Sequence, residues 1–403
     1  MKDKIFGWFK NLTLKVEFMS NYFSSSFTLG ILGGGQLGKM LLYETRKYDI
    51  NTKVLDPSPE APCRIACNEF VQGNLMDYDT VIEFAKNVDV LTIEIENVNV
   101  DALEALETEG KKVFPSAKTL KLIRDKGIQK KFYEDNSIPT SPFKCYETRA
   151  EIEADYKQHK FQLPIVWKSR TGGYDGRGVS VLKKDKDIKE LPDTSCILEE
   201  MVNFKNELAV IVARSASGET KTYPVVEMEF HPTANQVEYV ICPARISKDI
   251  SQKAQDVARK VSQAYGHVGL LAVELFQTQD DNILVNEVAP RPHNSGHYSI
   301  EGAFTNQFEQ HMRAILDLPL GETESKVGAV MVNLVGEENY EGEVYYKNIE
   351  KIMGLKGVIP HIYGKAQTRP FRKMGHVTIV DKDINIARLT AEKVKGLIKV
   401  ISE

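Results

Sequence analysis

Between residues 27 and 114, short apolar runs alternate with amphipathic helical patterns, and this alternation constrains the fold more than any other feature of the chain. The elements expected from these patterns are strands at 27–32, 52–55 and 88–95 and helices at 37–48 and 81–85. Strands that alternate with helices form a parallel sheet covered on both faces. The sequence therefore predicts a Rossmann-like domain at residues 27–116, preceded by an N-terminal extension at 1–26.

A glycine turn follows the first of these strands. Residues 33–38 read Gly-Gly-Gly-Gln-Leu-Gly, which satisfies G-x-G-x-x-G, and Asp56 ends the next strand. Glycines let the backbone approach a phosphate, and the N-terminus of the following helix offers N–H donors. The pattern is typical of dinucleotide binding, but the same turn suits another phosphorylated ligand or no ligand at all.

Composition narrows the class of protein. The 403 residues are 42% hydrophobic and carry a formal net charge of -4, which suits roughly three soluble domains. The near balance of 52 basic and 56 acidic residues argues against a nucleic-acid partner, and no apolar run approaches the ~18 residues of a membrane span. The five cysteines form no C-x-x-C pair, which indicates reduced thiols. We therefore expect a cytoplasmic protein with no nucleic-acid or membrane partner.

A second glycine-rich loop, at residues 168–178, joins strand patterns at 164–168 and 179–182. Four glycines within seven residues indicate a flap whose backbone can close over phosphate oxygens. Lys168 ends the first strand, so its ammonium can be aimed at a phosphate. The loop differs from a Walker loop, because no helix pattern and no Gly-Lys-Ser/Thr string follow it.

Two glutamates lie within apolar runs on either side of a turn. Glu274 belongs to the run at 271–276 and Glu287 to the run at 283–287, and Asp280-Asp281-Asn282 separates the two. If Asp280 and Asp281 form a two-residue turn, Glu274 lies directly opposite Glu287. Like charges placed opposite one another destabilise a sheet, and a cation between them resolves the conflict. We therefore expect a divalent metal ion, Mg²⁺ or Mn²⁺, with Asn286 as an additional oxygen ligand.

The strand lysine, the glycine flap and the carboxylate pair together resemble the ATP-grasp superfamily. Four strings, at residues 33–40, 94–98, 170–178 and 286–297, are similar to the 5-(carboxyamino)imidazole ribonucleotide synthases. The resemblance runs from about Phe27 to the C-terminus. It implies a mixed α/β and α+β protein: the Rossmann-like domain, an ATP-grasp domain at 117–326 with a lid at about 140–203, and a small β-rich C-terminal domain at 327–403. Helical patterns are expected at 118–136, 251–265 and 390–401.

The resemblance implies carboxylation of the exocyclic amine of 5-aminoimidazole ribonucleotide in purine biosynthesis. ATP and bicarbonate are the co-substrates, carboxyphosphate is the intermediate, and ADP and phosphate are released. The family is typically dimeric, and its front domain helps to hold the ribonucleotide. Two alternatives stay open: another ATP-grasp ligase, such as a formate-using purine ligase or a biotin carboxylase, and an NAD-dependent oxidoreductase built on the glycine turn.

The resemblance also implies the site residues. Those for ATP are Arg124, Lys168, Gly173, Tyr174, Asp175, Gly176, Arg177, Gly178, Val179, Glu199, Glu200, Met201, Val202, Glu207, Asn286 and Glu287. Those for the metal are Glu274 and Glu287, and those for the ribonucleotide are Gln36, Leu37, Glu96, Tyr174, Arg177, Lys365 and Arg372. Those for bicarbonate and catalysis are Arg291, His293, Asn294 and Lys365. A further nucleotide contact near Phe230 or His231 is not assigned.

Two local features bear on these residues. Pro290 and Pro292 stiffen the backbone that presents Arg291 and His293, and arginine can grip a carboxylate with two parallel hydrogen bonds. A basic turn at residues 364–373 matches the family's phosphate site. It has Phe371 where the commoner family pattern has glycine, so its local conformation is expected to differ.

Overall fold

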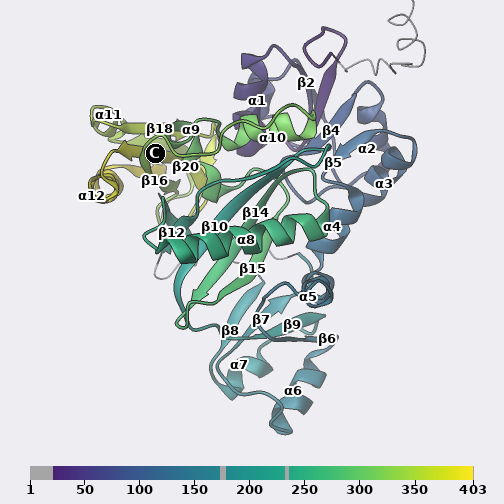
Figure 1. Ribbon diagram of the computed structural model, residues 1–403, viewed down its shortest axis with the longest axis vertical. Coiled ribbons are helices and arrows are strands. Elements are labelled where there is room, and N and C mark those ends of the chain that lie inside the picture. Colours follow the sequence, from purple (N-terminus) through teal and green to yellow (C-terminus); the bar gives the residue numbers. More distant parts are fainter. Residues whose placement is uncertain (1–20, 173–177, 232–235, 403) are drawn as a thin grey trace, which may run out of the picture.

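The computed structural model describes residues 21–172, 178–231 and 236–402 (Figure 1). Most of the N-terminal extension and five of the flap residues (Gly173, Tyr174, Asp175, Gly176 and Arg177) therefore lie outside the described residues. None of the described helices is long and apolar enough to cross a membrane.

The front of the chain forms the expected parallel sheet. Its five strands are ordered β3-β2-β1-β4-β5, and every neighbouring pair is parallel. The elements are β1 (Thr28–Leu32), α1 (Gln36–Lys47), β2 (Asn51–Asp56), β3 (Glu69–Gln72), α2 (Tyr78–Ala85), β4 (Val90–Ile93), α3 (Val100–Thr108) and β5 (Lys112–Phe114). The prediction of a Rossmann-like sheet is confirmed.

The single helical pattern predicted at 118–136 is wrong in one respect, because it forms two helices. α4 (Ala117–Arg124) ends at Asp125, whose backbone is extended, and α5 (Lys126–Asp135) begins there. The Asp125 carboxylate accepts hydrogen bonds from Gly127 N at 2.8 Å and Ile128 N at 3.0 Å, so it caps α5. Sequence periodicity alone does not reveal such an internal cap.

A small four-stranded sheet, ordered β6-β9-β7-β8, lies at the bottom of Figure 1, in the region predicted as the lid and called the lid below. Its elements are β6 (Phe143–Tyr146), α6 (Arg149–Lys157), β7 (Ile165–Ser169), β8 (Val179–Leu182), α7 (Asp185–Lys189) and β9 (Cys196–Glu200). β7 and β8 pair antiparallel with Lys168 opposite Val179, so the predicted hairpin around the flap is confirmed.

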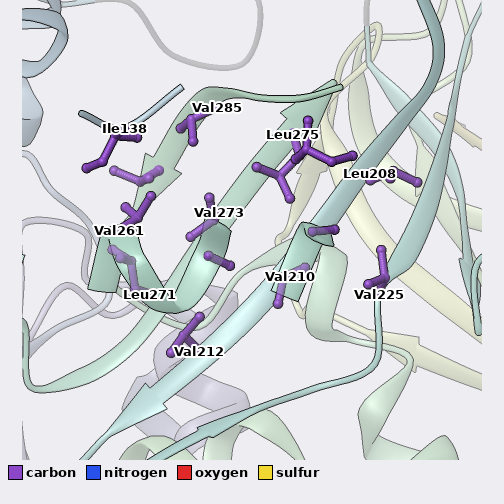
Figure 2. Packing of buried hydrophobic residues seen from close by; sticks show 14 of the residues in the cluster. Ile138, Leu208, Val210, Val212, Val225, Val261, Leu271, Val273, Leu275 and Val285 are labelled. Carbon is purple, nitrogen blue, oxygen red and sulfur yellow. The ribbon is translucent and has the colours of Figure 1, made fainter. Parts of the chain in front are cut away.

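The largest sheet has nine strands, and its main path is β15-β14-β10-β12-β13-β16-β20-β18. α8 (Lys248–Tyr265) covers one face, where side chains including Val210, Val261 and Val273 form a continuous core (Figures 1 and 2). The strands of its first half are β10 (Phe204–Arg214), β11 (Thr220–Thr222), β12 (Val226–Phe230), β13 (Val237–Cys242), β14 (Gly269–Thr278) and β15 (Ile283–Ala289). On the other face, α9 (Ser299–Gly302) and α10 (Gln307–Ile315) cover only part of the sheet, and α10 also packs on α1.

The C-terminal residues extend this sheet with β16 (Gly328–Val335), β20 (Lys373–Asp381) and β18 (Val358–Ile362). A separate three-stranded sheet contains β17 (Gly342–Lys347), β19 (Gln367–Thr368) and β21 (Lys399–Ser402), and α11 (Ile349–Met353) lies nearby in the chain. The closing helix predicted at 390–401 is wrong at both ends. It is α12 (Ile384–Leu397), and the last residues form β21 because they pair with β17.

Candidate active site

The carboxylate pair lies where the sequence predicts it. Glu274 on β14 and Glu287 on β15 are direct partners in an antiparallel ladder, so both side chains leave the sheet on the same face. This is the face opposite α8, and Glu207 on β10 shares it, because Glu274 pairs with Ala209, two residues along β10. Three carboxylates therefore share this face of the sheet, on the part that α9 and α10 leave open.

The hairpin reaches this register by a route that the sequence analysis did not foresee. Thr278 N donates to Asn282 O at 2.9 Å, and Asp281 adopts a left-handed φ of 61°, so the loop has three residues and not two. That loop alone would shift the register by one residue. A β-bulge at Asn286 shifts it back, and Glu274 faces Glu287 again.

The bulge also brings Asn286 to the site. Neighbouring residues of a regular strand point to opposite faces, but a bulge re-aims one of the side chains. Asn286 Oδ1 accepts a hydrogen bond from Lys168 Nζ of the lid at 3.0 Å, while Glu287 Oε1 lies 2.9 Å from Lys126 Nζ of α5. The lid lysine and the carboxylate pair are thereby brought together.

The electrostatics of the three glutamates favour a bound cation. Burial, and then the neighbouring Glu287 and Glu207, raise the pKa of Glu274 to about 8. Burial raises the pKa of Glu207 to about 7. Desolvation also opposes the charge of Glu287, but the Lys126 ammonium outweighs it and keeps the pKa of Glu287 below the ordinary value. A divalent ion at this position would favour the charged form of all three groups.

The oxygen atoms of Glu274, Glu287 and Asn286 are suitable ligands for Mg²⁺. Two carboxylates and an amide oxygen are hard oxygen ligands. Within the described ranges, no group of three or more His, Cys, Asp or Glu residues converges on one point. With two carboxylates and one amide oxygen, the protein would supply part of the shell, and nucleotide phosphates and water usually complete it around Mg²⁺.

On the lid side, Lys168 Nζ pairs with Glu199 Oε2 at 2.9 Å. Glu200 ends β9, and Met201 and Val202 lie in the segment that connects β9 to β10. Gly178 has a left-handed φ of 75°, and its carbonyl accepts a hydrogen bond from Ser169 N at 2.9 Å, which closes the base of the flap before Val179.

The segment at residues 290–294, in which Pro290 and Pro292 flank Arg291, lies beside the carboxylate pair. It is called the proline-framed string below. His293 Nε2 is 3.6 Å from Glu274 Oε1, and Arg291 Nε is 2.9 Å from Glu96 Oε1, the front-domain residue predicted for the ribonucleotide. Ser295 N donates to His293 Nδ1 at 3.3 Å, and Ser295 Oγ lies 2.9 Å from the same atom. With Nδ1 as the acceptor of both contacts, the ring proton is assigned to Nε2. Burial, followed by the charges of Arg291 and Lys373, lowers the pKa of His293 to about 3. His293 is therefore a neutral ring that offers an N–H toward the site.

Asn294 is held by a reciprocal amide pair. Its Nδ2 donates to Asn333 Oδ1 at 2.8 Å and its Oδ1 accepts from Asn333 Nδ2 at 2.9 Å. Asn333 lies on β16, so this pair fastens the string to the C-terminal extension of the sheet. Asn294 therefore holds the string in position through this pair of hydrogen bonds.

The basic turn, at residues 364–373, includes β19 and ends at the start of β20. Lys365 Nζ donates to Lys373 O at 2.8 Å, and Arg372 Nη1 donates to Gln367 O at 2.6 Å. Phe371 adopts a left-handed φ of 61°. The turn thus takes a conformation that glycine adopts without cost, although this chain has phenylalanine there. The charge of Lys373 opposes part of the rise in the pKa of Glu274, so the basic turn lies within electrostatic reach of the carboxylate pair.

The glycine turn at the front is satisfied by the protein's own carboxylates. Gly34 N donates to Asp56 Oδ2 at 2.7 Å, and the N–H groups of Leu37 and Gly38 point to Glu94 Oε2 at 3.2 and 3.3 Å. A Cβ atom on Gly35 would lie 2.5 Å from Glu94 Oε1, so glycine is needed there for Glu94 to approach. These contacts do not favour a dinucleotide pyrophosphate at the turn. Gln36, which begins α1, lies beside them.

One predicted residue is turned away from the carboxylate pair. Arg124 Nη1 donates to the carbonyl of Val98 in the front domain at 2.9 Å. Arg124 was predicted for ATP, and that role stays a prediction. Lys126, two residues later, lies next to Glu287 and was not predicted. Lys130 and Lys373 were also missed. A lysine at a helix start or a strand end carries no local signal of a site, and only the tertiary contacts reveal its role.

Comparisons with known proteins identify the parts of the chain. Family models match residues 27–124 as a ribonucleotide synthetase preATP-grasp domain, 131–308 as an ATP-grasp domain, and 329–389 as a phosphoribosylaminoimidazole carboxylase C-terminal domain. The fold and the site therefore define an ATP-grasp enzyme.

Individual relatives narrow the class further. The N5-carboxyaminoimidazole ribonucleotide synthase of Bacillus subtilis is 38% identical, over 87% of this chain and 91% of its own length. The structure of the synthetase from Thermotoga maritima has 43% identity and a TM-score of 0.85, covering 94% of this chain and all of that one. The Aspergillus clavatus synthase in complex with ADP and 5-aminoimidazole ribonucleotide has 33% identity and a TM-score of 0.83, covering 92% and 98%. The chain belongs to the N5-carboxyaminoimidazole ribonucleotide synthase family.

Proposed function

We propose that this chain catalyses the ATP- and bicarbonate-dependent carboxylation of 5-aminoimidazole ribonucleotide on its exocyclic amine. The observation that carries the proposal is the pairing of Glu274 with Glu287 on an open sheet face, within reach of the lid residue Lys168. Membership of the family supports the choice of substrates, because the Aspergillus relative binds ADP and 5-aminoimidazole ribonucleotide. No contact in the described structure favours the NAD-dependent alternative.

The nucleotide half of the reaction is phosphoryl transfer. A bicarbonate oxygen attacks the γ-phosphorus of ATP, the bond to the bridging oxygen of ADP breaks, and carboxyphosphate forms. Such transfer needs positioning and neutralisation of charge more than covalent help from the protein. Lys168 would face the phosphates from the lid. Glu274 and Glu287 would hold Mg²⁺, or Mn²⁺, and the ion, when bound, supplies further positive charge at the phosphate oxygens.

Bicarbonate needs converging donors beside these phosphates. The Nε2–H of His293 and the guanidinium of Arg291 are placed to supply them, since His293 lies 3.6 Å from Glu274 and Arg291 follows β15. Glu96 forms an ion pair with Arg291, with Oε1 2.9 Å from Nε, and Arg291 Nη1 donates to Pro292 O at 3.1 Å, so two contacts hold the guanidinium. Asn294 keeps the string in place through Asn333.

The second half transfers carbon dioxide, or its equivalent, to the amine. The new bond joins the amine nitrogen to the carboxyl carbon, the bond to the phosphate oxygen breaks, and the phosphate leaves with the former bicarbonate oxygen. The amine proton can leave with the phosphate. Lys365 and Arg372 would hold the 5′-phosphate of the ribonucleotide, and Glu96 and the start of α1 would contact the rest. A homodimer and a cytoplasmic location remain predictions.

An isotope experiment tests this function directly. With bicarbonate labelled in all oxygens with ¹⁸O, we expect one labelled oxygen to appear in each inorganic phosphate released, and only when ATP and 5-aminoimidazole ribonucleotide are also present. Mass spectrometry of the phosphate measures the transfer. ADP release with unlabelled phosphate would mean that water, and not bicarbonate, attacks the γ-phosphorus, and the proposal would fail.

A further inference from the structure

A buried carboxylate joins two lysines that come from different parts of the molecule. Glu199 on β9 pairs with Lys168 on β7 at 2.9 Å and with Lys130 on α5 at 3.0 Å. Glu199 is 4% exposed and Lys130 is 1% exposed, so both charges are withdrawn from water. The assigned function uses Lys168 but leaves Lys130 without a role.

The two ammonium groups differ in what they offer a ligand. Lys130 Nζ also donates to Thr140 Oγ1 at 2.6 Å and to Ser141 Oγ at 3.0 Å, so two hydrogen bonds and the ion pair with Glu199 surround its ammonium group. Lys168 Nζ has two protein partners in the described part of the chain, Glu199 and Asn286. Its third donor can therefore bind a phosphate, whereas Lys130 cannot reach one without giving up a contact.

Charge balance gives Lys130 a role. Glu199 with Lys168 alone would form a neutral pair, which attracts a phosphate weakly. Lys130 leaves the trio with one net positive charge and keeps Glu199 ionised at the centre: desolvation opposes that charge, but Lys168 and Lys130 together hold the pKa of Glu199 below its ordinary value. We propose that Lys130 is a positioning residue of the nucleotide site, which balances Glu199 so that Glu199 can hold Lys168 in place while Lys168 keeps its charge for ATP. This inference rests on the proposed function.

The contacts also fix the position of Lys168 relative to the metal carboxylates. Glu199 and Lys168 belong to the lid sheet, whereas Lys130 lies on α5 and Asn286 lies on the central sheet. The ammonium of Lys168 is thus held between a lid residue that Lys130 anchors and the residue next to Glu287. A purely structural role for Lys130 would instead be to fasten the segment at Thr140 and Ser141, with no specific effect on ATP.

Substitutions that change the charge at Lys130 distinguish the positioning role from the purely structural one. We expect Lys130→Met to weaken ADP binding, measured by calorimetry, and to raise the KM for ATP by roughly tenfold or more, with less than a twofold change in the KM for the ribonucleotide. Lys130→Arg keeps the charge and is expected to retain most of the affinity. The double variant Lys130→Met/Glu199→Gln again carries one net positive charge and is expected to bind ADP more tightly than Lys130→Met.

The outcomes are distinct. An ADP affinity within twofold of wild type in folded Lys130→Met, or equal losses in both KM values, would overturn the inference. If Lys130→Met does not fold, the double variant decides: an ADP affinity within about tenfold of wild type supports the inference, and a larger loss overturns it. If wild-type protein binds no adenine nucleotide, the proposed function fails together with this inference, whereas a failure confined to the variants removes this inference alone.

Discussion

At the residue scale, Glu274 illustrates how a site can be unfavourable to the fold that contains it. Its carboxylate is largely withdrawn from water and directly opposite another carboxylate, and its pKa is about 8. An acid whose pKa is higher in the folded state than in the unfolded state loses stability as the pH rises from the unfolded pKa through the folded one. The metal-free protein is therefore destabilised at neutral and alkaline pH.

This leads to a prediction for Glu274→Gln. Without metal, the variant should be more stable than wild type at pH 8 by on the order of 1–2 kcal/mol, and this pH-dependent difference should vanish at about pH 3, where the wild-type glutamate is protonated in both the folded and the unfolded state. Mg²⁺ with ADP should stabilise wild type and leave the variant nearly unchanged. Denaturant unfolding with and without ligand measures both effects. Equal stabilisation of the two proteins by Mg²⁺ and ADP would contradict the assignment of Glu274 as a ligand.

At the scale of elements, the hairpin shows what a sequence can and cannot predict. Alternating apolar residues and an Asp-Asp-Asn turn were enough to place Glu274 opposite Glu287. They did not reveal that a three-residue loop and a bulge at Asn286 cancel one another, because both depend on backbone conformations that many residues adopt. The closing helix failed for a related reason: its end is set by the pairing of β21 with β17, which is not local in sequence.

The basic turn gives a prediction at the same scale. Phe371→Gly should raise the free energy of unfolding by about 1 kcal/mol, because glycine adopts a left-handed φ without strain. Its KM for the ribonucleotide should stay near that of wild type, whereas Arg372→Ala should raise this KM far more than the KM for ATP. Phe371→Ala is the control, since it keeps the strain and removes the ring that contacts His231. A lower stability of Phe371→Gly than of Phe371→Ala would contradict the strain argument, because both variants lack the ring and differ only in their backbone preference.

At the scale of the whole molecule, the order of the sheets and hairpins could be predicted from the sequence, whereas the contacts that hold them together could not. The front sheet, the lid hairpin and the central hairpin each follow from local patterns. The joints consist of single polar contacts across long stretches of chain, such as Lys130 with Glu199 and Asn294 with Asn333. No periodicity marks these residues. No periodicity marks the pairing of the C-terminal strands either; these strands extend the central sheet through the pairing of β16 with β13.

His311 at the joint between α10, β4 and β14 carries a prediction for pH. It is fully buried, Leu270 N donates to Nδ1 at 3.3 Å, and Nε2 lies 3.0 Å from Thr92 Oγ1. Burial lowers its pKa to about 3, below the ordinary value of 6.5. A histidine with a depressed folded pKa contributes stability that is present above the unfolded pKa and is lost as the pH falls toward the folded one.

Wild type should therefore lose stability relative to His311→Gln between pH 7 and pH 5, by about 2 kcal/mol for this one group. Urea unfolding of both proteins at the two pH values measures the difference, and the comparison cancels the contributions of all other titrating groups. Identical pH dependence in the two proteins would mean that His311 is not held neutral at this joint.

The central claim is that the open face around Glu274 and Glu287 serves an ATP-dependent ligase that consumes bicarbonate and 5-aminoimidazole ribonucleotide. The most direct measurement is the rate of ADP release by purified protein with ATP, Mg²⁺ and both other substrates, each omitted in turn. We predict full activity only with the complete mixture, and a loss of about 100-fold or more in Glu287→Gln, whose thermal unfolding should stay close to that of wild type. ADP release that needs neither bicarbonate nor the ribonucleotide, or that survives in Glu287→Gln, would contradict the account.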